Sequence, residues 1–206
     1  MGLAHYTKVK SDGTIQEIGK EYYAYLFKDA TGYDVPIPEA IEYIQYHLDQ
    51  TIANIVNISV NNPNISNDVN GVVLMDKTPE EQMELYKTLL IGHFPEIKSY
   101  PEINIKNVDP SMEDHFSPAA YISSPIDDFD QESIFLNQKR IDGDYNYLYT
   151  TLAHEGIPGH MYQNIYFKTQ DTNIIRKVLK NSGYVEGWAT YTELYMYNFV
   201  DGVDQD

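Results

Sequence analysis

The chain has 206 residues, enough for one large domain or two small ones, and 42% of them are hydrophobic, which predicts a packed core. A net charge of −17 argues against nucleic acid as a partner, because contacts to phosphates need clustered lysine and arginine. The absence of cysteine excludes disulfides, thiolate metal sites and a cysteine nucleophile. No apolar run approaches the roughly 18–20 residues of a membrane span. The first residues lack the apolar core of a signal peptide. Because we expect the chain to be part of a longer protein, the cytoplasm and the cell envelope both stay open as locations.

The first half of the chain has helical patterning. Apolar side chains recur at helical spacing over 19–34 and 37–58. Thr78 and Glu81 form the pattern of a capping box, which predicts the start of a third helix. We therefore predict a helical N-terminal part that comprises residues 1–100.

From residue 101 the patterning changes. Short runs rich in β-branched and aromatic residues, bounded by Pro, Asp and Ser, predict up to three strands, which we expect to pair antiparallel. These runs lie at 102–108, 119–125 and 132–138. Three helices follow, at 145–167, 173–180 and 183–199. The predicted fold class is α+β, mostly helical, with a small sheet beside the first of these helices in a second part that comprises residues 101–206.

The segment "HEGIPGH" resembles a zinc-hydrolase motif with two extra residues. In His-Glu-x-x-His the two histidines lie four residues apart on one helical face and point at one metal. His154 and His160 lie six apart, which on a straight helix leaves them about 120° apart and about 9 Å along the axis. Pro158 cannot donate a hydrogen bond to the His154 carbonyl, and Gly159 tolerates unusual backbone angles. We therefore expect a bulge or break that accommodates two residues. It would bring His160 to the position that the fourth residue after His154 takes on a regular helix.

A third ligand is expected from the helix at 183–199. Glu186 and Glu193 lie on one face of that helix but about 10.5 Å apart along its axis, so both cannot bind one ion. One would bind the metal, and the other would accept the imidazole N–H of a histidine ligand. The alternative is a broken helix that carries two satisfied histidines and solvated glutamates. Against it, Glu186 lies in an apolar, aromatic helix, where an unpaired buried carboxylate is costly.

These residues resemble the bacterial domain-of-unknown-function family 885, which is placed with the zinc metallopeptidases of the gluzincin type. The family pattern His-Glu-x-x-Pro-Gly-His-x-x-Gln matches 154–163, and Glu-Gly-Trp-Ala-x-Tyr-x-Glu matches 186–193. The stretches "GKEYYAYLFKDATGYDVPIPE" and "SIFLNQ" also look like this family, so the resemblance covers most of the chain. Family members are much longer, so the chain is expected to be a middle piece of a larger protein.

The resemblance implies a zincin-like fragment with a defined set of site residues. It implies that His154, His160 and Glu186 bind Zn²⁺, that Glu155 is the general base, and that Glu193 is the outer carboxylate. The expected activity is hydrolysis of peptide bonds in a peptide or small-protein substrate. Two rivals stay open: an inactive peptide-binding or scaffold module of the same fold, and a metal-dependent amidase that acts on cell-wall peptides.

Two further expectations concern the surroundings of this site. A peptide substrate is expected to pair as an added strand along a sheet edge near 134–137. Local candidates for stabilising an oxyanion are Tyr184, Tyr191 and Tyr195, although tyrosines in so tyrosine-rich a chain are more often packing residues.

Overall fold

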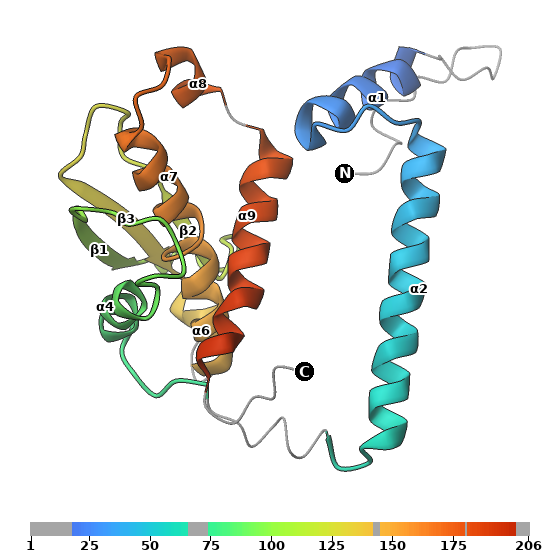
Figure 1. The fold of residues 1–206 in the computed structure, drawn as a ribbon, viewed down its shortest axis with the longest axis horizontal. Coiled ribbons are helices and arrows are strands. Elements are labelled where there is room, and N and C mark those ends of the chain that lie inside the picture. The colour runs from blue at the N-terminus through green and yellow to red at the C-terminus, as the bar shows by residue number, and fades with distance from the viewer. Residues whose placement is uncertain (1–17, 66–73, 142–144, 180, 201–206) are drawn as a thin grey trace. The chain divides into compact units, whose positions relative to one another are not determined.

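The computed structural model describes residues 18–65, 74–141, 145–179 and 181–200. They form two compact units (Figure 1). The first unit contains α1 (Ile18–Thr31), α2 (Ile37–Asn61) and the short segment Asn181–Tyr184, and the second contains the remaining elements. The division at residue 100 predicted from the sequence stays a prediction.

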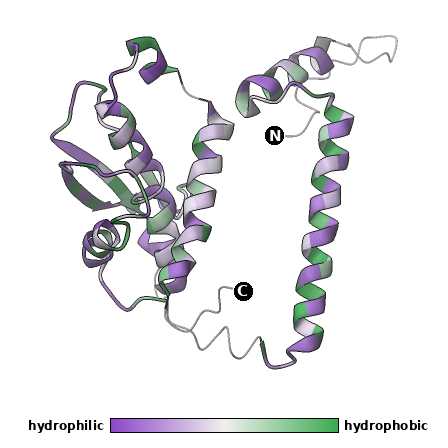
Figure 2. Cartoon of the chain, viewed as in Figure 1, coloured by the Kyte–Doolittle hydropathy of each residue, from purple (hydrophilic) through white to green (hydrophobic). Residues whose placement is uncertain are grey.

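The long helix α2 of the first unit is amphipathic, as its sequence pattern predicts. Apolar and polar residues alternate in bands along it (Figure 2). The other described residues of this unit leave the apolar stripe uncovered, and each of its side chains is at least half exposed. The stripe consists of Ile41, Ile44, Leu48, Ile52 and Ile55.

The second unit begins with α4 (Pro79–Leu89), whose predicted capping box is confirmed. The Thr78 hydroxyl accepts a hydrogen bond from the Glu81 amide at 3.2 Å, and the Glu81 carboxylate accepts one from the Thr78 amide at 2.9 Å. Further along α4, the buried Tyr86 donates to the carbonyl oxygen of Tyr149 at 3.2 Å. This bond ties α4 to α6 (Tyr145–Glu155), which ends in the first half of the motif.

The three predicted strands form one mixed sheet. They are β1 (Glu102–Asn107), β2 (Ala119–Ile122) and β3 (Gln131–Leu136), in the order β1-β3-β2. β2 and β3 are consecutive and pair antiparallel, as expected. β1 pairs parallel to β3, so the expectation of a purely antiparallel sheet is wrong. The reason is topological: the chain leaves β1 and crosses to the far side of β3 before it forms β2.

The central position of β3 also overturns the expected site of strand addition. Both backbone edges of residues 134–137 are occupied, because β1 pairs along one side and β2 or the preceding loop along the other. An extended peptide therefore cannot pair with this segment. The free edge nearest the motif belongs to β2. On its outward side, the Ala119 carbonyl already accepts from the Ser117 hydroxyl at 2.6 Å.

The remaining elements are helical, so the fold is α+β and mostly helical, as predicted. They are α5 (Gln138–Ile141), α7 (His160–Thr169), α8 (Ile174–Val178), α9 (Ser182–Tyr195) and the single 3₁₀ turn η2 (Met196–Phe199). The core of this unit lies between β2, β3 and the helices α4, α6 and α7, and Tyr149, Leu152, Ile157 and Met161 are fully buried in it. Among the described residues, no helix is long and apolar enough to cross a bilayer.

The predicted break in the motif helix is present. α6 ends at Glu155 and α7 begins at His160, with a cis peptide bond before Pro158. The Tyr162 amide donates to the carbonyl oxygen of Gly156, six residues back, at 3.1 Å, whereas an α-helix would make this bond four residues back. The joint at 156–159 therefore accommodates two residues more than a regular helix.

Gly159 adopts unusual backbone angles, as expected, with φ −75° and ψ −133°, which are neither helical nor extended. Space is a second constraint, because a Cβ at this position would overlap the carbonyl oxygens of Ala153 and His154. The joint thus packs directly onto the end of α6. From outside, the indole N–H of Trp188 donates to the Pro158 carbonyl at 2.8 Å.

The close approach at Gly159 gives a testable prediction. Gly159→Ala should lower the free energy of unfolding by at least about 2 kcal/mol, because the new methyl group forces the joint away from α6. Denaturation in urea measures this change. Gly187→Ala is the matched control, since a Cβ on Gly187 of α9 meets nothing within 4 Å. It should leave stability unchanged or raise it by about 0.5–1 kcal/mol. Equal stability of the two variants would contradict the account of the joint.

Candidate metal centre

Three side chains from three helices converge in the second unit. His154 lies in the last turn of α6, His160 is the first residue of α7, and Glu186 lies in α9. The Nε2 atoms of both histidines lie 3.7 Å from Oε2 of Glu186. One ligating atom from each of the three residues lies within 4.8 Å of the others. Within the described part of the chain, this is the only such group found.

The two histidine–carboxylate distances suit a zinc ion with little adjustment, whereas the ligating atoms as a group span up to 4.8 Å and must draw closer to share one ion. Two ligand atoms that each lie about 2.1 Å from a tetrahedral ion are about 3.4 Å apart. The two histidine–carboxylate separations exceed that value by only a few tenths of an ångström. The histidine side chains are largely buried, 24% and 12% exposed. The side chain of Glu186 is 62% exposed, so the expectation of a buried carboxylate on this helix is wrong. The group is therefore open to solvent on the side of Glu186, which is where water or a substrate could enter.

Glu193 approaches the same imidazole as Glu186 but at its other nitrogen. Its Oε2 lies 3.1 Å from Nδ1 of His154. An ionised carboxylate only accepts hydrogen bonds, so this contact favours the tautomer that carries its proton on Nδ1 and keeps the Nε2 lone pair for a metal. The two glutamates lie seven residues apart on α9 and can both reach His154 because the imidazole ring extends between them. Glu186 and Glu193 thus contact opposite nitrogens of one imidazole, and their expected roles as inner and outer carboxylate stay predictions.

Glu155, which follows His154, faces the edge strand of the sheet. Its Oε2 accepts a hydrogen bond from the backbone N–H of Tyr121 in β2 at 2.8 Å. Burial raises the pKa of the Glu155 carboxyl above its usual value, and the charge of Glu186 adds to this. The bond from Tyr121 and the neighbouring His154 oppose the shift. The hydrogen bond from the Tyr121 amide thus holds the Glu155 carboxylate in a defined direction.

The three tyrosines of α9 that were candidates for an oxyanion site are exposed or bonded elsewhere. Tyr184 and Tyr191 are more than half exposed. The Tyr195 hydroxyl lies 2.9 Å from Nδ1 of His93. The geometry assigns none of these tyrosines to an oxyanion site.

Sequence reasoning missed the residues that hold this site in place. Trp188 holds the motif joint, and the Tyr121 amide holds Glu155. Neither contact has a local signal, because the partners lie more than 29 residues apart in the sequence. A buried ion pair between Glu132 and Lys168 was also missed. In that case a signal existed, since Glu132 occupies a core-facing position in an alternating strand.

Comparisons with known proteins agree with the family resemblance. The family described as "Bacterial protein of unknown function (DUF885)" matches residues 3–204. No match was found among the curated proteins. Among solved structures, the chain is similar to the crystal structure of "the putative lipoprotein from Colwellia psychrerythraea", with a TM-score of 0.66 and 20% sequence identity. That alignment covers 90% of this chain and 35% of the other, so the chain spans about a third of that protein's length. The chain belongs to the domain-of-unknown-function family 885.

The contact between Glu193 and His154 predicts a measurable effect on metal binding. Glu193→Gln should weaken zinc affinity by roughly 10- to 100-fold, because the acceptor that fixes the imidazole loses its charge. Glu186→Gln should weaken it further, since a ligand itself is altered. Zinc titration by calorimetry measures both, with the exposed Glu96→Gln as control. Unchanged affinity in Glu193→Gln would contradict the role of this contact.

Proposed function

We propose that this family member carries the catalytic metal centre of a zinc-dependent hydrolase that cleaves peptide bonds. The observation that supports the proposal most is the convergence of His154, His160 and Glu186 with one open side. Two imidazoles and one carboxylate form a ligand set typical of catalytic zinc, which keeps its fourth position for water or substrate. The adjacent Glu155 favours hydrolysis over the oxygen chemistry that iron performs in similar ligand sets.

Each residue then has a distinct task. Zinc, when bound, would act as a Lewis acid toward water and the scissile carbonyl. Glu155 would accept the proton of the attacking water and pass it to the leaving amine. Its Oε2 is held by the Tyr121 amide, which leaves Oε1 as the atom for proton transfer. Glu193 would keep His154 in the tautomer that presents Nε2 to the metal.

The peptide substrate is the part of the proposal that depends on the family resemblance. An amidase that acts on cell-wall peptides would use the same ligands and differ only in its pocket. An inactive peptide-binding or scaffold module would keep the ligands without turnover. Because the chain spans only about a third of its structural neighbour, these alternatives are best separated in the intact protein.

The proposal predicts that Glu155→Gln separates metal binding from turnover. The variant keeps the shape of the side chain but loses the proton acceptor, so hydrolysis should fall by roughly 10²- to 10⁴-fold. Zinc affinity should stay within about twofold, since Glu155 is not among the three convergent ligands. The measurements are zinc titration and cleavage of a defined peptide mixture by the intact protein.

Three outcomes would contradict the proposal. Bound zinc without any hydrolysis by the unmodified protein would favour the scaffold module. Cleavage restricted to cell-wall peptide amides would favour the amidase. Loss of zinc binding in Glu155→Gln, with the fold intact, would show that Glu155 is a ligand rather than the base.

A further inference from the structure

Glu132 is a carboxylate on the core-facing side of the central strand. β3 alternates, and Glu132, Ile134 and Leu136 share its buried face. The Glu132 side chain is only 2% exposed and pairs with Lys168 of α7, which is 6% exposed, at 2.8 Å. Burial of two charges is costly unless both are paired and hydrogen-bonded, so a buried ion pair is weak evidence for a stabilising role by itself.

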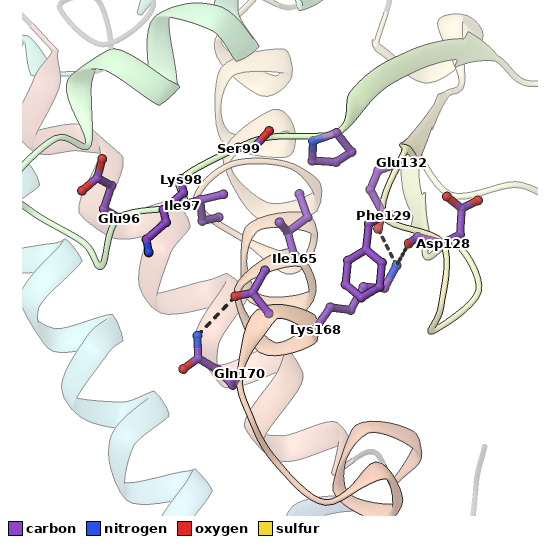
Figure 3. Close-up of a pocket in the computed structure, with 12 residues that line it drawn as sticks. Glu96, Ile97, Lys98, Ser99, Asp128, Phe129, Glu132, Ile165, Lys168 and Gln170 are labelled. Atoms are coloured by element: carbon purple, nitrogen blue, oxygen red, sulfur yellow. Dashed lines mark hydrogen bonds and ion pairs between the residues drawn. The ribbon is translucent and has the colours of Figure 1, made fainter.

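The hydrogen bonds around this pair connect α7 to the loop between β2 and β3. Besides Glu132, Lys168 donates to the Ser124 hydroxyl at 2.5 Å and to the Asp128 carbonyl at 3.1 Å. The Ser124 amide donates in turn to Oε2 of Glu132 at 3.0 Å. The pair borders a cavity of about 490 Å³, and Figure 3 shows Lys168 directed toward Glu132 and Asp128. All three Nζ donors are used within the protein, so the pair acts on the fold rather than on a ligand in the cavity.

Tyr121 connects this network to Glu155. Its hydroxyl donates to Oε2 of Glu132 at 2.8 Å and accepts from the Asn164 amide of α7 at 2.6 Å. The backbone N–H of Tyr121 points away from β3, toward the free edge of β2. The Pro118 carbonyl accepts from the Asn137 amide, so alternate residues of β2 face β3 and the N–H of Tyr121 faces outward. That N–H bonds Glu155 at 2.8 Å.

We propose that the buried Glu132–Lys168 pair is a positioning element for Glu155. It anchors Tyr121 by its hydroxyl, and the Tyr121 amide then fixes the direction of the Glu155 carboxylate. Asn164 and Lys168 lie one turn apart on α7, the helix that begins with His160. The same helix therefore carries a candidate metal ligand and the anchor of the strand that holds the candidate base. The kinetic part of this inference rests on the proposed function, whereas the structural part does not.

Tyr121→Phe is the most informative variant because it removes one hydroxyl and keeps the ion pair. Glu132 retains its bonds to Lys168 and Ser124, so the fold should persist. In the zinc-free chain, amide hydrogen exchange at residue 121 should accelerate at least about tenfold. Exchange at Ala120 and Ile122, which pair with β3, should stay unchanged. Glu155→Ala should accelerate exchange at residue 121 to a similar degree, because it removes the acceptor itself.

The kinetic readout uses the intact protein and a zinc titration. Tyr121→Phe should lower kcat for peptide cleavage by about tenfold, because the base loses its orientation, while KM and zinc affinity stay within about twofold. The matched control is Tyr166→Phe, the same change at a half-buried tyrosine of α7, which should alter neither exchange at residue 121 nor kcat.

Two exchange results would overturn the inference. Unchanged protection of the residue 121 amide in Tyr121→Phe would show that the network does not hold it. Equal acceleration at residues 120, 121 and 122 would show that the hydroxyl only stabilises the sheet. If the unmodified protein cleaves no peptide, the proposed function fails, but the exchange experiment still decides whether the network positions Glu155.

Discussion

The candidate site depends on one hydrogen bond at the joint between α6 and α7. The Tyr162 amide reaches the Gly156 carbonyl across six residues, so two extra residues are accommodated without loss of helical phase on either side. His160 thereby comes next to His154, with ring centroids 4.8 Å apart. The close packing of Gly159 and the indole bond to Pro158 hold the same joint from two sides. A longer motif thus brings its two histidines side by side, as the shorter motif does on an unbroken helix.

The four carboxylates of the site and its surroundings differ in the groups that they contact. Glu186 is exposed, and its carboxylate lies near the Nε2 atoms of both imidazoles. Glu193 instead contacts Nδ1 of His154. Glu155 is turned toward the sheet by a backbone amide. Glu132 forms an ion pair with the buried Lys168. Four carboxylates of the same chemistry therefore have four different environments, and their surroundings rather than their identity suggest the tasks proposed for them.

Much of this arrangement could be predicted from local patterns. The capping box at Thr78, the break at Pro158 and the convergence of three candidate ligands follow from helix geometry and from family motifs. The parallel pairing of β1 could not be predicted, because strand direction depends on where the connection to β2 crosses. The contact of Tyr121 with Glu155 was equally inaccessible, since it joins residues 34 apart through tertiary packing. Local sequence thus identified the candidate ligands but not the strand that orients the candidate base.

The most direct test of the central claim is a crystal structure of the zinc-loaded protein with anomalous scattering recorded at the zinc edge. The account predicts a single anomalous peak about 2.0–2.2 Å from Nε2 of His154, Nε2 of His160 and a carboxylate oxygen of Glu186. Glu193 should remain on Nδ1 of His154, outside the coordination shell. A peak coordinated by Glu193 with Glu186 in solvent, or no peak between the two histidines at saturating zinc, would contradict it.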